Sequence, residues 1–101
     1  MAQLVTKKTV TLLWDPVTKD SSGVKLTAIP RYNVYLGDST IYGTTGDSFL
    51  SITFPSSGNK TIKVTTVITA PDGITKIESA PASIDVTVFL APAAPVNLRI
   101  L

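Results

Sequence analysis

The sequence predicts an all-β domain, a sandwich or a barrel, and three observations lead to it. Apolar and polar residues alternate along several short runs, which is the pattern of strands with one buried face. The runs are rich in Val, Ile, Thr, Tyr and Phe, which fit a pleated surface better than a helix. Gly and Pro separate the runs at regular spacing, and no stretch has a helical period. The length of 101 residues fits one domain with a single core.

The first long strand is predicted over residues 9–14, and it carries the only Trp of the chain. Alternation places Val10, Leu12 and Trp14 on one face and the residues between them on the other. Asp15 and Pro16 then end the strand, because proline has no N–H to donate to a ladder. We expect this large aromatic, on the inner face of an early strand, to be the centre of a two-sheet core.

Further strands are predicted from the same alternation and from the turns between them. Their ranges are residues 4–6, 31–36, 40–42, 48–54, 60–70, 74–78 and 82–89, with turns at 37–39 and 71–73. Each of four strands groups side chains on a shared face: Tyr32, Val34 and Leu36; Leu50, Ile52 and Phe54; Ile62, Val64, Thr66 and Ile68; and Ile84, Val86 and Val88. Thr65 is among the polar residues expected to point outward.

The connection from residue 15 to residue 30 is unusually long for a compact domain. Prolines bound it at both ends, and the run 20–23 is a cluster of turn-forming residues. Leu26 and Ile29 are expected to pin this loop to the core. Long loops in small domains are often functional, while an insertion with no partner is the alternative interpretation.

The order of these elements resembles a fibronectin type III domain over residues 9–88. The resemblance rests on the strand that ends at Trp14, on residues 32–35 and 62–67, on the turn 71–73 and on residues 78–83. It implies a seven-stranded, immunoglobulin-like antiparallel β-sandwich over residues 1–89, followed by an extended tail over residues 90–101. The chain departs from the family where Ile62 stands at the position of a usual Tyr, and in the length of the loop after Trp14.

The tail combines a stiff spacer with a short strand-like segment. Prolines favour an extended backbone over residues 91–95, and Val96, Leu98 and Ile100 then alternate with more polar neighbours. Three interpretations are open: a docking strand that adds to a partner's sheet, the first strand of another repeat, or a tail that folds back on its own domain. In the first, the partner-binding residues are Val96, Leu98, Arg99 and Ile100.

Composition argues against several functional classes. The chain has no Cys and no His, which removes thiol nucleophiles, zinc ligands of the usual kinds and histidine bases, and its aspartates sit in turns. We therefore predict no enzyme activity, no cofactor and no metal. The nine Lys and Arg residues are dispersed rather than clustered, which disfavours nucleic-acid binding. No apolar run is long enough to span a bilayer, and no secretory leader is evident after Met1.

The chain is also similar to small fibronectin-III-like proteins of tailed bacteriophages. The residues that carry this similarity are Met1, the loop residues 18–26 and the ending 91–101 in a chain without Cys. It implies a structural or interaction module of a virion, in its decoration, tail or baseplate. The expected partners are a larger virion structural protein, a host-surface glycan bound weakly, and a second copy of the chain. The alternative is an accessory module of a secreted polysaccharide-degrading enzyme.

The loops at residues 15–30 and 70–76 would form the recognition surface of such a module. The residues predicted to contact a partner there are Lys19, Asp20, Ser21, Lys25, Asp72 and Lys76. Arg31, Tyr35 and Tyr42 are a further possible patch for stacking on sugars. Cross-strand packing is the competing explanation for the two tyrosines.

Overall fold

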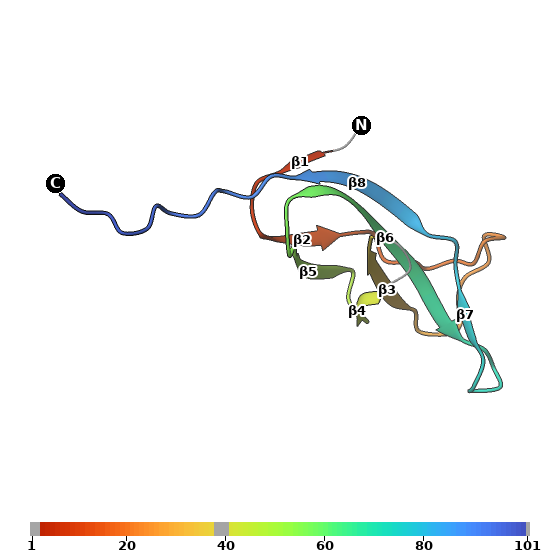
Figure 1. Cartoon of the computed structure of the whole chain (residues 1–101). Helices are drawn as coiled ribbons and strands as arrows, with labels where there is room; N and C mark the ends of the chain where they lie inside the picture. The colour runs from red at the N-terminus through yellow and green to blue at the C-terminus, as the bar shows by residue number, and fades with distance from the viewer. Residues whose placement is uncertain (1–2, 38–40, 101) are drawn as a thin grey trace.

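The computed structural model describes residues 3–37 and 41–100, and this part of the chain contains eight strands and no helix. The all-β prediction is therefore confirmed. The strands are β1 (Gln3–Val5), β2 (Thr9–Leu13), β3 (Arg31–Leu36), β4 (Ile41–Thr45), β5 (Phe49–Thr53), β6 (Gly58–Thr69), β7 (Lys76–Glu78) and β8 (Ala82–Val88). Figure 1 shows them as two facing layers, with the C-terminal segment leaving one end of the domain.

The two layers are unequal in size. The larger sheet has the order β1-β8-β6-β3-β4, with β7 paired to the end of β6, and the smaller sheet consists of β2 and β5. All paired strands are antiparallel except β1 and β8, which are parallel in the register Gln3↔Val86 to Val5↔Val88. The prediction of a purely antiparallel sandwich is thus wrong at its first strand. The reason is that residues 6–8 carry the chain from the larger sheet across to β2, so β1 lies beside β8 instead of β2.

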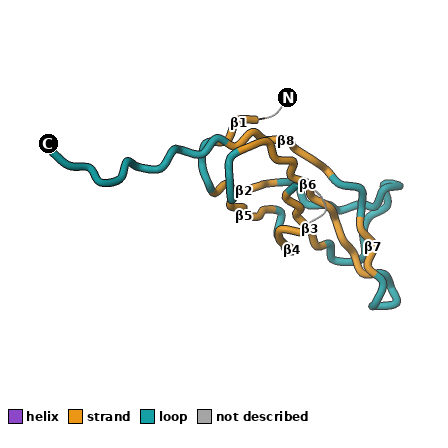
Figure 2. Tube along the Cα trace, in the orientation of Figure 1, coloured by secondary structure: helices purple, strands orange, loops and turns teal. Residues whose placement is uncertain are grey.

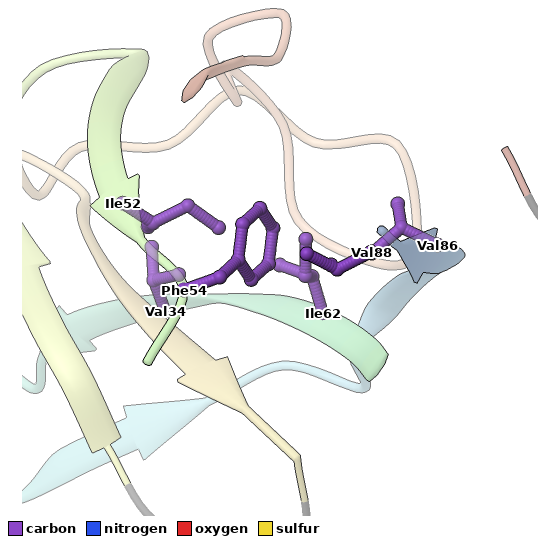
Figure 3. Close-up of a cluster of buried hydrophobic side chains, with 6 residues drawn as sticks. All are labelled: Val34, Ile52, Phe54, Ile62, Val86 and Val88. Atoms are coloured by element: carbon purple, nitrogen blue, oxygen red, sulfur yellow. The ribbon is translucent and has the colours of Figure 1, made fainter. Parts of the chain in front are cut away.

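The core lies between the layers and draws on both of them. Phe54 is fully buried at its middle, with Ile52 on one side and Ile62 on the other (Figure 3). The buried cluster consists of Val34, Ile52, Phe54, Ile62, Val86 and Val88. Each such side chain contributes about 1.5–3 kcal/mol by leaving water. The alternation predicted for these strands is confirmed at these positions.

Trp14 has a smaller role than the sequence predicts. It lies one residue beyond β2 and is half-buried against the core, while Val10 and Leu12 face inward as expected. Its ring meets the buried Tyr32 edge to face, with centroids 5.4 Å apart. The centre of the core is Phe54, because residue 54 continues the inner row of β5 between both sheets.

Three further positions differ from expectation. Ile29 is 88% exposed and does not pin its loop, whereas Leu26 is half-buried as predicted. Thr65 is buried although it belongs to the outer face, because its hydroxyl is held by Glu78. Ile84 lies beside Ile62 in the larger sheet and is nevertheless 44% exposed.

The loop at residues 15–30 is held by Tyr32, a buried residue of β3. The hydroxyl of Tyr32 accepts a hydrogen bond of 2.9 Å from the backbone N–H of Val17. The predicted turn at residues 71–73 is present, with Gly73 at φ 75°. The turn predicted at residues 37–39 falls largely on residues 38–40, which lie outside the described residues, as does Thr40 of the predicted strand 40–42.

Candidate binding surfaces

The first candidate loop contains a small hairpin of its own. Lys19 and Lys25 face each other in an isolated antiparallel bridge, and Asp20 organises the turn between them. Its Oδ1 accepts bonds from the Ser22 hydroxyl (2.7 Å) and from the backbone N–H groups of Ser22 (2.9 Å) and Val24 (3.0 Å). The Ser22 hydroxyl, followed by these amides, lowers the pKa of Asp20 below its ordinary value. Asp20 therefore shapes the loop that presents the two lysines.

The second candidate loop, between β6 and β7, is built in the same way. Asp72 accepts bonds from the backbone N–H groups of Ile74 (2.9 Å) and Thr75 (2.8 Å) and from the Thr75 hydroxyl (2.5 Å). The Thr75 hydroxyl and then the two amides lower the pKa of Asp72 to about 2. Lys76 donates from Nζ to the Thr69 hydroxyl at 2.7 Å, across the two strands.

The two loops lie at the end of the domain opposite the C-terminal tail (Figure 1). The structure brings Lys19, Asp20 and Ser21 into one groove of about 370 Å³ with the β6–β7 ribbon, where Ile77 and Glu78 form part of the other wall. The other three predicted residues, Lys25, Asp72 and Lys76, do not line this groove. The structure therefore brings three of the six predicted loop residues together in this groove.

A second groove of about 400 Å³ lies on the outer face of the larger sheet. Its lining combines two cations, an amide, hydroxyls and a carboxylate with an exposed isoleucine: Ile29, Arg31, Asn33, Thr44, Val67, Thr69, Lys76 and Glu78. Glu78 lines both grooves, so the two recesses meet at the end of β7.

Glu78 is the centre of a polar network that the sequence analysis did not single out. Its Oε2 accepts hydrogen bonds from the hydroxyls of Thr65 and Tyr35 (2.5 Å for Tyr35) and from Asn33 Nδ2 (3.3 Å). The Thr65 hydroxyl, then Tyr35 and Asn33, lower the pKa of Glu78. An ionised carboxylate of this kind is a hydrogen-bond acceptor for polar ligands. The only sequence signal for this network was the position of Asn33 and Tyr35, which alternate on the outward face of β3.

The two tyrosines of the possible sugar-stacking patch have different partners. Tyr35 reaches Glu78 on the outer face of the larger sheet. The hydroxyl of Tyr42 instead accepts a bond of 2.9 Å from the backbone N–H of Thr53, which ties β4 to β5 in the smaller sheet. The geometry therefore favours cross-strand contacts as the explanation for both residues.

The C-terminal tail leaves the domain after Leu90. That residue is half-buried, and its backbone N–H donates to the Ser57 hydroxyl at 3.0 Å. Beyond it, Val96, Leu98 and Ile100 are 82%, 93% and 99% exposed. Figure 2 shows the segment as an irregular trace that extends away from the strands, so the tail does not fold back on its own domain.

The described residues contain no group of three or more Cys, Asp or Glu side chains arranged to hold a metal ion. Within the same ranges there is also no helix with the length and apolarity needed to cross a bilayer. No family model matches the chain, and no curated protein or solved structure matches it. The resemblance to fibronectin type III domains remains a prediction from the sequence.

Proposed function

We propose that this protein is a non-enzymatic interaction module of a bacteriophage particle, attached to a larger structural protein by its C-terminal tail. The observation that carries the proposal is the exposure of Val96, Leu98 and Ile100 on a segment outside the folded domain. An apolar tail left in water is unfavourable and prone to aggregation, so burial against a partner is its stable state. The domain then presents its opposite end, with both candidate loops, to the surroundings (Figure 1).

The test is incorporation into particles. We compare phage particles assembled with the full chain, with a chain ending at Leu90, and with Leu98→Asp, and we measure copies per particle by quantitative mass spectrometry. Val24→Asp is the matched control, because Val24 is also exposed, at 61%, but lies in the loop at the other end. Loss of incorporation by the truncation and by Leu98→Asp, with Val24→Asp retained, is the expected result. Particles that retain the truncated chain at full copy number would rule out attachment by the tail.

We propose further that the domain makes weak contacts with host-surface glycans through the second groove, on the outer face of the larger sheet. Arg31, Asn33 and Glu78 supply donors and an acceptor there, and the exposed Ile29 supplies an apolar wall. Titration of the ¹⁵N-labelled chain with host polysaccharide is expected to shift the amides of β3 and β7. Arg31→Ala should weaken these shifts and Lys60→Ala should not, because Lys60 does not line this groove. Unchanged spectra at millimolar saccharide would exclude this site.

A further inference from the structure

One edge of β2 has no strand beside it in the part of the chain that the structure describes. Within the same residues, β2 has only β5 as a strand neighbour. The ladder bonds Trp14 N–H to Ser48 C=O (3.0 Å) and Phe54 N–H to Lys8 C=O (2.8 Å) fix which residues bond across the pair. Because bonded and non-bonded pairs alternate, the backbone groups of Thr9, Thr11 and Leu13 point away from β5.

Two independent contacts support this alternation. The side chains of Thr9 and Thr53 are bonded at 3.1 Å, and those of Thr11 and Ser51 at 3.0 Å, as expected for the closely spaced non-bonded pairs. On β5, the N–H of Thr53 points outward and donates to Tyr42. The outer edge of β5 therefore has a partner at Thr53, whereas within residues 3–37 and 41–100 the outward N–H and C=O groups of β2 have no strand partner.

The apolar side chains beside this edge are only partly covered. Leu12 of β2 and Trp14, directly after this strand, pack against the core but are only half-buried. By contrast, Ile52 of β5, the other strand of the small sheet, and Phe54, directly after β5, are fully buried. One additional strand beside β2 would cover the first group and would make the smaller sheet three strands wide.

The tail has the chemistry that such a strand requires. Val96, Leu98 and Ile100 alternate with Asn97 and Arg99, so a strand over this segment has one apolar and one polar face. The spacer 91–95 contains two prolines and spans about 15 Å at the polyproline rise of about 3.1 Å per residue. This stiff spacer carries the segment outward instead of letting it turn back to its own β2.

The direction of the tail also fits. The tail continues in the direction of β8, whereas β2 runs in the opposite sense (Figure 1). In a second copy placed beyond the tail in the same orientation, β2 would therefore run antiparallel to the incoming segment. Pairing with the chain's own β2 would need a reversal within the proline spacer.

We propose that residues 96–100 of one copy pair antiparallel with the β2 edge of a second copy. Val96, Leu98 and Ile100 cover the half-buried residues beside that edge, and Asn97 and Arg99 face solvent. The contact joins different surfaces of the two copies, and because the copies share one orientation it repeats along a line and produces open rows of modules. This inference rests on the proposed function in using the tail as a docking element, and the last tail of a row remains free for the larger structural protein.

The first experiment measures molar mass by light scattering across a concentration series. The mass of the full chain is expected to rise with concentration, while a chain ending at Leu90 stays a monomer. A full chain that remains monomeric at millimolar concentration overturns the proposal, as does association that survives the truncation. The first of these results leaves incorporation into particles intact, so failure here is distinguishable from failure of the proposed function.

The second experiment tests whether the tail binds the outer edge of β2 or that of β5. Thr11→Pro removes an N–H that points away from β5, and Ser51→Pro removes the corresponding outward N–H of β5; both lose the same Thr11–Ser51 hydroxyl contact. Thr11→Pro is expected to weaken association at least about tenfold by removing one interchain bond and obstructing the edge, while Ser51→Pro leaves it unchanged. Equal association of the two variants, both shown to be folded by circular dichroism, overturns the assignment to β2.

A third measurement does not depend on the folding of these variants. A fluorescent peptide of residues 94–101 is added to the truncated chain that ends at Leu90 and carries no substitution. Binding is followed by fluorescence anisotropy. Saturable binding is expected, with loss of binding for the same peptide carrying Leu98→Pro, which cannot complete the strand. Absence of binding, or equal binding by the proline peptide, contradicts strand addition.

Discussion

Asp72 illustrates how a single exposed carboxylate organises a turn. It receives three hydrogen bonds from Ile74 and Thr75, and they hold its pKa at about 2. Asp20 orders the other loop in a comparable way, through bonds from Ser22 and Val24. Both residues stood out in the sequence as turn aspartates, and their observed role is to fix backbone conformation.

The lowered pKa of Asp72 predicts acid sensitivity. A carboxylate with a lower pKa in the folded state than in the unfolded chain, where it is about 3.9, stabilises the fold at higher pH. This contribution is complete above about pH 5 and is lost progressively as the pH falls to about 2. Asp72→Asn should therefore lower the melting temperature at pH 7, and the difference from the unmodified chain should shrink at pH 2. Thermal unfolding by circular dichroism from pH 2 to 7 measures it, with Asp15→Asn as control; a constant difference across this range contradicts the mechanism.

Two phenylalanines five residues apart test the position of the core. Phe54 is fully buried between the sheets, whereas Phe49 is 50% exposed. Phe54→Ala is expected to reduce the free energy of unfolding by about 3–5 kcal/mol, and Phe49→Ala by less than about 1 kcal/mol. Denaturation in urea measures both. Similar losses for the two variants would place the centre of the core elsewhere, with Trp14 as the next candidate.

At the scale of elements, strand alternation was predictable and strand neighbours were not. The period of two is local, so it placed Val34, Ile52 and Phe54 inward before any partner was known. The parallel pairing of β1 with β8 arises because the chain crosses from one layer to the other after β1. The three residues of β1 contain no pattern from which this crossing could be predicted.

The candidate site was only partly predictable for the same reason. Lys19, Asp20 and Ser21 were recognisable from turn composition, and they line one groove. Glu78 was not, because its partners Tyr35 and Thr65 are 43 and 13 residues away in the sequence. Only the register of β3, β6 and β7 brings these three side chains together.

The loop after β2 gives a prediction at this scale. Tyr32→Phe removes the acceptor of the Val17 N–H, at a cost of about 1 kcal/mol in unfolding free energy. Hydrogen exchange at Val17 should accelerate while the strands remain protected. Tyr42→Phe is the matched control, since it frees the Thr53 N–H instead. Unchanged exchange at Val17 in Tyr32→Phe would show that other contacts hold the loop.

At the scale of the whole molecule, the tail dominates the dimensions. The chain measures 72 × 28 × 20 Å, with a Cα radius of gyration of 18.3 Å. A compact domain of about 90 residues is expected to have a radius of gyration of about 12 Å. The tail extends along the axis of the domain in Figure 1, which accounts for the difference. The shape in solution therefore distinguishes an extended tail from one that folds back.

Small-angle X-ray scattering measures this shape directly. At low concentration, where copies do not pair, the full chain is expected to keep a radius of gyration well above that of the chain ending at Leu90. As concentration rises, the cross-section should stay constant while the length grows, because head-to-tail contacts add modules along one axis. Equal radii for the two chains at low concentration would mean that the segment after Leu90 packs on its own domain. In that case Val96 and Leu98 would contribute to folding stability, and truncation would lower the melting temperature instead of preventing association.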